Sequence, residues 1–366
     1  MSLFKNWFRK SSEPPPPYTM TDFWRWFASQ EPAFAQTISE QQDIEQRFLQ
    51  PLSEALQKLR PHIFFLVGIS GQHEFELILT PDGNLEMVAF IERLVAAAPP
   101  LPRWRFIALK PGNLQEQFGI EMAGYRFDTD NLFFFPRVDP QFPDEIDLVI
   151  VHQDYTEADA TTIANGSYLF LENYLGEWSC MSQLDVVDFC GPEAVTKALI
   201  PIGKLRDYLS WREKEFVEKY EGTRYSLDED PYTIFKRRTP EETILITLLN
   251  TKLLRWENKA SHPWLVVLHG RYEGDQQGLP DEKVQAELEA VETELMAQLK
   301  TEEGYLNIGR ETGQNLRRVF WATKDFRKAS EQIDALIARY RGSLQIDYEI
   351  YRDKYWRTFD HFEKLA

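Results

Sequence analysis

Residues 344–352 read Leu-Gln-Ile-Asp-Tyr-Glu-Ile-Tyr-Arg. From Leu344 to Ile350, every second residue is large and apolar or aromatic, and the residues between them are polar. A period of two is typical of a β-strand that is packed on one side. Asp347 and Glu349 would then point to the opposite, wetter face of the sheet. We therefore predict a strand over 344–352 with one buried face.

The hundred residues before this strand alternate between strand and helix periods with clear turns between them. In chain order we expect a strand at 264–272, a helix at 281–300, a hairpin of strands 305–311 and 316–323, and a helix at 325–340. With the strand at 344–352 the order is βαββαβ, the split-βαβ arrangement known as ferredoxin-like. The predicted fold class is therefore α+β, with a C-terminal ferredoxin-like antiparallel sheet whose two helices cover one face. Two more strand candidates, 232–237 and 243–249, would extend or cover that sheet.

The region before residue 222 is less regular and mixes helical and strand-like patterns. Thr21 is a candidate helix cap, Pro51 should kink or restart a second helix, and an acidic turn at 228–231 is the best boundary between domains. At 366 residues, the length favours two domains. We predict a flexible peptide and proline linker at 1–17, a mixed α+β domain at 18–222 and the ferredoxin-like domain at 231–366.

The two cysteines and the hydropathy pattern limit the classes of protein to which this chain can belong. Cys180 and Cys190 are ten residues apart, which is neither a zinc spacing nor a redox CxxC motif, so we expect no metal, no cofactor and a reducing compartment. No stretch approaches the roughly 20 apolar residues of a membrane span. No apolar run with a cleavage site follows the basic N-terminus, so a secretory signal is not expected. These features predict a cytoplasmic protein.

The charge balance is strongly acidic. The chain has 58 acidic and 41 basic residues, and its net charge of −17 disfavours direct binding of nucleic acid. Between residues 112 and 200 there are 16 acidic and three basic residues, a net charge of −13. Such a surface would steer a basic protein partner. A solvated face that only aids solubility is the alternative.

Candidate binding residues come from the predicted open face of the C-terminal sheet. This face would gather His269, Arg271, Tyr305, Asn307, Asp347, Glu349 and Tyr351. Tyrosine and arginine are favoured at protein interfaces, which would make the face a docking surface. Alternatively, Arg271 merely pairs with Asp347 or Glu349 across the strands. A histidine beside a carboxylate is also able to do acid–base chemistry.

Several hydrophobic motifs in the C-terminal third have a family resemblance. They are the strand at 264–268, the hairpin with Gly304-Tyr305-Leu306-Asn307-Ile308-Gly309 and Arg317-Arg318-Val319-Phe320-Trp321-Ala322, and the closing Asp353-Lys354-Tyr355-Trp356. Over 232–359 the chain resembles the bacterial DUF695 family of uncharacterised proteins. The N-terminal half looks like the companion region that occurs with this domain. By analogy the domain is similar to RraB-type inhibitors of ribonuclease E, which bind an enzyme, but fold alone does not fix function. No catalytic residue follows from the resemblance.

Three hypotheses about function follow. The first is a non-enzymatic protein-binding or regulatory module that acts through its acidic surface or the open sheet face. The second is an enzyme with a carboxylate-lined site between the domains. The third is a cytoplasmic antidote to a basic toxin, which shares the acidic-surface argument.

Overall fold

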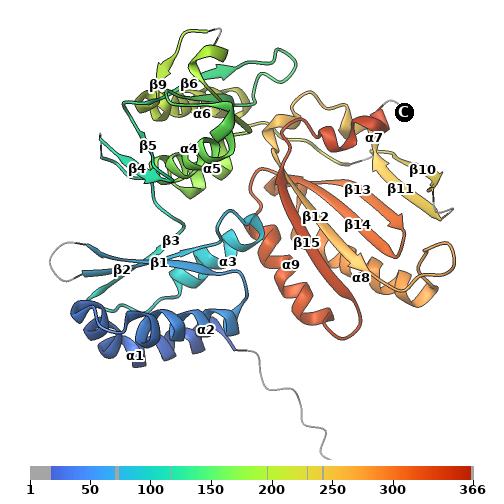
Figure 1. Cartoon of the computed structure of the whole chain (residues 1–366). Helices are drawn as coiled ribbons and strands as arrows, with labels where there is room; N and C mark the ends of the chain where they lie inside the picture. The colour runs from blue at the N-terminus through green and yellow to red at the C-terminus, as the bar shows by residue number, and fades with distance from the viewer. Residues whose placement is uncertain are drawn as a thin grey trace, which may run out of the picture.

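The computed structural model describes residues 18–363 except 71–73, 116, 196, 229 and 241–242. The predicted flexible peptide at 1–17 lies outside the described residues. Figure 1 shows three lobes, coloured blue to cyan, green, and yellow to red along the chain. We call them the first lobe (18–109), the middle lobe (110–222) and the C-terminal lobe (223–363).

The first lobe packs helices on a small sheet. Its strands are β1 (Phe64–Ser70), β2 (Glu74–Thr80) and β3 (Trp104–Ala108), with β1 antiparallel and β3 parallel to β2. Its helices are α1 (Met20–Glu40), a π-helical turn (Glu45–Leu49) that runs into α2 (Gln50–Leu59), and α3 (Leu85–Ala96). The core is aromatic, and Phe23, Phe27 and Phe48 are fully buried in it. The helix cap is Thr19 in a capping box with Asp22, so the prediction of Thr21 was wrong by two residues.

The middle lobe has its own sheet and its own core. The strands β6 (Leu132–Arg137), β7 (Asp147–His152), β8 (Val186–Cys190) and β9 (Ile200–Pro201) lie in the order β8-β7-β6-β9. Beside them are the hairpin β4 (Gly119–Met122) and β5 (Tyr125–Asp128) and the helices α4 (Ala160–Leu175), α5 (Glu177–Gln183) and α6 (Leu205–Tyr220). The described part of 18–222, predicted as one mixed domain, therefore holds a three-stranded and a four-stranded sheet with separate hydrophobic cores, besides the two-stranded hairpin.

The C-terminal lobe is built on a six-stranded antiparallel sheet in the order β10-β11-β13-β14-β12-β15. The strands are β10 (Tyr232–Arg238), β11 (Ile244–Asn250), β12 (Trp264–Arg271), β13 (Tyr305–Gly313), β14 (Leu316–Thr323) and β15 (Gln345–Arg352). The helices are α7 (Thr251–Leu254), α8 (Glu282–Gln298), α9 (Arg327–Tyr340) and α10 (Asp360–Glu363). The four predicted strands and two predicted helices are present, and the two additional candidates extend the sheet beside β13.

The two faces of this sheet are covered differently. On one face, Trp264, Val266 and Leu268 pack against α8 and α9. On the other face, one end is covered by the chain's own C-terminus, where Trp356 and Phe359 pack on the strands. The expectation of a wholly open second face is therefore wrong, because only the far end of that face is left uncovered.

The first lobe protects one edge of the C-terminal sheet. Helix α3 packs against α9 and β15 (Figure 1). The carboxylate of Glu86 accepts a hydrogen bond from the backbone N–H of Ile350 at 2.8 Å, and its backbone carbonyl accepts one from the Tyr348 hydroxyl at 3.0 Å. Donors on an edge strand that would otherwise be free are thereby satisfied. Within the described ranges, no helix has the length and apolar character needed to cross a bilayer.

Candidate functional site

Five polar residues form one cross-strand row on the uncovered end of the second sheet face. Asp347 on β15 lies opposite His269 on β12, His269 lies opposite Arg318 on β14, Arg318 lies opposite Glu311 on β13, and Glu311 lies opposite Thr247 on β11. Residues that are directly opposed in antiparallel strands point to the same face and touch. We call these five residues the charged row.

Hydrogen bonds and ion pairs join the members of the charged row. His269 Nδ1 lies 2.7 Å from Asp347 Oδ1. Arg318 Nη1 donates to Glu311 Oε1 at 2.9 Å, and the Thr247 hydroxyl donates to Glu311 Oε2 at 3.2 Å. The row, which crosses five strands, thus contains two bonded groups: Asp347 with His269, and Glu311 with Arg318 and Thr247.

Two further charged residues flank the row. Arg271 Nε donates to Asp347 Oδ2 at 2.8 Å, and Glu349 Oε1 lies 3.5 Å from His269 Nε2. Burial disfavours the ionised form of Asp347, but hydrogen bonds from Arg271 and His269 outweigh it and lower the pKa of Asp347 below its usual value. The side chains of Arg271, Asp347 and Glu349 are each about half exposed. Exposed pairs of this kind contribute less than about 1 kcal/mol to folding, so stability alone gives little reason for them.

His269 is the buried centre of this arrangement. Its side chain lies under the charged residues, and within the described part of the chain its Nε2 has no hydrogen-bond partner. Nδ1 faces the carboxylate of Asp347, and Nε2 faces the carboxylate of Glu349 across 3.5 Å. The groups of this arrangement that an outside partner can reach are the half-exposed side chains of Arg271, Asp347 and Glu349.

Two predicted site residues lie on the other face of the sheet. Tyr305 packs in the core under α8 and α9, and Asn307 is opposite Trp321, which belongs to the same core. The prediction that they share a face with His269 was wrong because β13 has a β-bulge between Asn307 and Gly309. A bulge inserts one extra residue into a strand. Odd-numbered residues before the bulge therefore point to one face of the sheet, and odd-numbered residues after it point to the other face.

Tyr351 is on the predicted face but at its covered end. It packs against the cluster that contains Trp356 and Phe359, and its hydroxyl lies 3.2 Å from that of Thr358. Of the seven predicted residues, the structure therefore brings together His269, Arg271, Asp347 and Glu349. Binding at these residues stays a prediction.

The sequence reasoning missed the members of the row on β11, β13 and β14. The hairpin turn offered a signal for two of them. Gln314 and Asn315 both have positive φ, as a two-residue hairpin turn requires, and such a turn sets Glu311 opposite Arg318. Counting back from that turn would have placed this pair on one face.

The carboxylates between the lobes form a joint. Asp144 accepts hydrogen bonds from the hydroxyls of Tyr220 and Tyr355, at 2.8 and 2.7 Å, and from Lys219. Asp185 accepts from Lys354, whose ammonium group is buried between the middle and C-terminal lobes. Burial, together with the nearby charge of Arg352, lowers the pKa of Lys354 to about 8. Because these carboxylates already bind donors from neighbouring elements, the seam is a structural connection.

The cysteines and the acidic clusters show no reactive or metal-binding geometry. Cys180 and Cys190 are free thiols, and burial raises the pKa of Cys180 to about 12, so its thiolate is scarce at neutral pH. No set of three or more His, Cys, Asp or Glu side chains placed to hold a metal ion occurs among the residues that the structure describes.

Residues 235–362 match the model of the DUF695 family, which is described as a family of unknown function. The matched segment runs from within β10 to within α10 of the C-terminal lobe, and it confirms the resemblance expected from the hydrophobic motifs. No curated protein and no solved structure shows significant similarity to the chain. The companion region and the analogy to inhibitors of ribonuclease E stay predictions.

Proposed function

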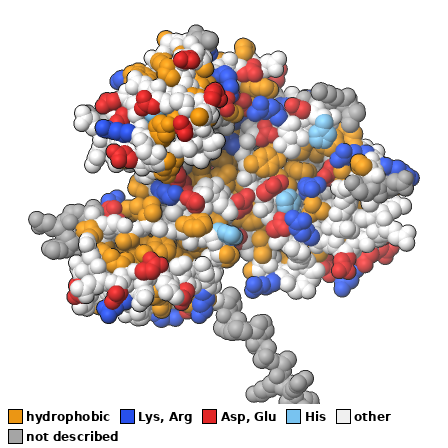
Figure 2. Space-filling model, viewed as in Figure 1, with side chains coloured by type: hydrophobic (Ala, Val, Ile, Leu, Met, Phe, Trp, Pro, Cys, Tyr) orange, Lys and Arg blue, Asp and Glu red, His pale blue; other side chains and the backbone are white. Residues whose placement is uncertain are grey.

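We propose that this protein is a non-enzymatic binding module that docks a basic protein on the uncovered end of its C-terminal sheet. The observation that carries the proposal is the group of Arg271, Asp347 and Glu349, with Arg318 of the charged row, whose side chains are partly exposed beyond the end covered by the C-terminus. Figure 2 shows acidic and basic side chains interspersed over the C-terminal lobe. The net charge of −17 would steer a basic partner, and the row would set its orientation.

We also infer that β12 to β15 with α8 and α9 form a ferredoxin-like core. Their order in the sheet, β13-β14-β12-β15 with antiparallel neighbours, supports this inference. β10 and β11 are then additions at one edge. The inference leaves function open, because this arrangement hosts many activities.

Glu349→Lys is the sharpest test of the docking surface. Glu349 is half exposed, so its replacement should leave the fold intact, and lysine reverses the charge beside His269. Glu218→Lys on α6 is the matched control, since Glu218 is also exposed and the change in net charge is identical. Wild-type and variant proteins would be used to capture partners from cell lysate at low and high salt, and a recovered partner would then be purified and titrated.

The two variants separate a specific surface from general charge. The proposal expects a stoichiometric, salt-sensitive partner whose affinity falls at least tenfold with Glu349→Lys and changes little with Glu218→Lys. Equal effects of the two variants, or no stoichiometric partner at low salt, would refute docking on this surface. A basic toxin is one partner that fits the same chemistry. The alternative of an enzyme between the lobes has less support, because Asp144 and Asp185 are held by structural donors.

A further inference from the structure

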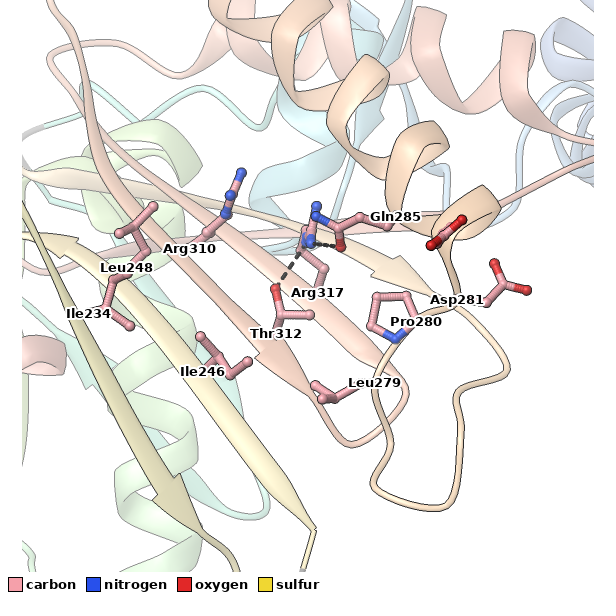
Figure 3. A pocket seen from close by; sticks show the side chains of 11 residues that line it. Ile234, Ile246, Leu248, Leu279, Pro280, Asp281, Gln285, Arg310, Thr312 and Arg317 are labelled. Atoms are coloured by element: carbon pink, nitrogen blue, oxygen red, sulfur yellow. Dashed lines mark hydrogen bonds between the residues drawn. The ribbon is translucent and has the colours of Figure 1, made fainter.

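A cavity of about 350 Å³ lies on the helix side of the C-terminal sheet, away from the charged row. It is bounded by the added strands β10 and β11, by β13 and β14, and by the loop and first turn of α8 (Figure 3). It forms where the added strands extend the sheet beyond the cover of α8. Its volume is in the range of small-molecule sites.

Arg317 is the buried cation of this cavity. Its side chain is 3% exposed, and its Nε donates to the Thr312 hydroxyl at 3.0 Å and its Nη2 to Gln285 Oε1 at 2.6 Å. Both acceptors are neutral, and Nη1 has no hydrogen-bond partner within the described ranges. The neighbouring Arg310 differs, because it has an ion-pair partner in Glu292 at 2.9 Å.

The unpaired state of Arg317 is energetically unfavourable. Burial lowers the pKa of Arg317 and the positive charge of Arg310 adds to the effect, while the carboxylates of Glu292 and Glu289 offset only part of it. A buried charge costs several kcal/mol unless a counter-charge and hydrogen bonds compensate for it. The planar guanidinium is suited to binding a carboxylate with two parallel hydrogen bonds. An anion in the cavity would supply what the protein lacks here.

Apolar side chains from the added strands and from the loop before α8 line the cavity beside these polar residues. Ile246, Leu248 and Leu279 line it, and Ile234 on β10 is 68% exposed although it is large and hydrophobic. Figure 3 shows Leu248 beside Arg310, and Ile246 and Leu279 below Thr312 and Arg317. The acidic Asp281 and Glu282 stand at the exposed rim, where water screens their charge.

We propose that this cavity binds a small organic acid, with its carboxylate against the guanidinium of Arg317 and its apolar body against Ile234, Ile246 and Leu279. The polar end supplies the counter-charge, and the apolar end covers surface that is otherwise exposed to water. This site is independent of the docking surface, because it lies on the opposite face of the sheet.

Hexanoate, hexanol and inorganic phosphate, at constant ionic strength, are the probes that test the proposal. Binding to the full chain would be measured by titration calorimetry and by the shift of the melting temperature. We expect saturable stabilisation by hexanoate and little by hexanol, which lacks the charge, or by phosphate, which lacks the apolar body. Arg317→Met should weaken hexanoate binding at least tenfold, the loss expected for a charged hydrogen bond of about 1.5–3 kcal/mol. Arg105→Met, at an exposed position of the first lobe, is the control.

The stability of the Arg317→Met variant without hexanoate distinguishes a binding role of Arg317 from a structural role. Without hexanoate, Arg317→Met should be as stable as the wild type or more stable, because it removes an unpaired buried cation. Should this variant fail to fold, Ile234→Glu serves instead, since it changes only an exposed wall residue and should repel hexanoate. Absence of saturable binding, binding that survives both substitutions, or equal stabilisation by phosphate would overturn the proposal.

Discussion

Lys354 Nζ lies 2.9 Å from Asp185 Oδ2, and this ion pair connects the end of the C-terminal sheet to the middle lobe. Lys354 is only 3% exposed, and Arg352, whose side chain is also largely buried, lies 3.5 Å from the same carboxylate group. Asp185 also accepts a hydrogen bond from the backbone N–H of Ile146. One carboxylate therefore balances two buried cations that come from the other lobe.

We predict that Asp185→Asn lowers the free energy of unfolding by roughly 3 kcal/mol, because removing one partner of a buried pair leaves uncompensated charge. Chemical denaturation followed by tryptophan fluorescence measures the change. Glu218→Gln, which removes one partner of the exposed pair between Lys214 and Glu218, is the control and should change stability by less than about 0.5 kcal/mol. Equal small effects of both variants would show that the joint carries little energy.

The burial of His262 should make the stability of the protein depend on pH. Its imidazole is buried beside the Ser261 hydroxyl, and burial, with a smaller effect of Lys324, lowers its pKa to about 3. The unfolded chain takes up the proton near pH 6.5, so the unfolded state binds more protons between pH 6.5 and 3. Stability is therefore fully present above pH 6.5 and is lost as the pH falls, by about 2 kcal/mol from this residue between pH 7.5 and 5.

His262→Asn tests that contribution, because asparagine can keep the hydrogen bond to Ser261 but does not titrate. The variant should be less stable than the wild type at pH 7.5 and should lose about 2 kcal/mol less on acidification to pH 5. Urea unfolding at a series of pH values gives both quantities. The same acid sensitivity in both proteins would mean that other groups cause the loss.

The C-terminal lobe could be predicted from the sequence because its periods are local and its turns are marked. Strand alternation at 344–352 and the helical repeats at 281–300 depend on neighbouring residues alone. The two cores within 18–222 could not be separated in this way. β2 pairs in parallel with β3, and β7 pairs in parallel with β8, and such pairings join segments separated by a helical crossover that no local pattern specifies.

The candidate site residues were only partly predictable, and a single inserted residue accounts for the two on β13. Alternation along β13 was extrapolated from Tyr305 and Asn307 without the bulge, which placed both on the wrong face. Gly309 within the strand was the available signal, since a glycine in a strand interior often marks a bulge. The pair of Arg318 and Glu311 lies on the turn side of the bulge, where the two-residue turn at Gln314 and Asn315 sets the register.

Gly309→Ala should destabilise the C-terminal lobe by roughly 3 kcal/mol. Gly309 has φ of +144°, a conformation that side chains rarely adopt, and an added Cβ would lie 2.0 Å from the backbone carbonyl oxygen of Leu248. Thermal unfolding measures the loss. Gly68→Ala on β1 is the control, because Gly68 has no atom within 4 Å of an added Cβ. A fully stable Gly309→Ala variant would show that the bulge can move along the strand.

Gly166→Ala sets helix propensity against packing. Gly166 lies inside α4, where alanine would favour the helix by about 1 kcal/mol. An added Cβ would lie 2.1 Å from the ring of Phe127, a fully buried side chain of the middle-lobe core, and overpacking of this kind costs typically 1–3 kcal/mol. We expect the steric clash to outweigh the gain in helix propensity, so that the free energy of unfolding falls by about 1 kcal/mol. Gly203→Ala has open space around the added Cβ and should be neutral or slightly stabilising. If Gly166→Ala were instead more stable than the wild type, the Phe127 ring would have to move freely within its core.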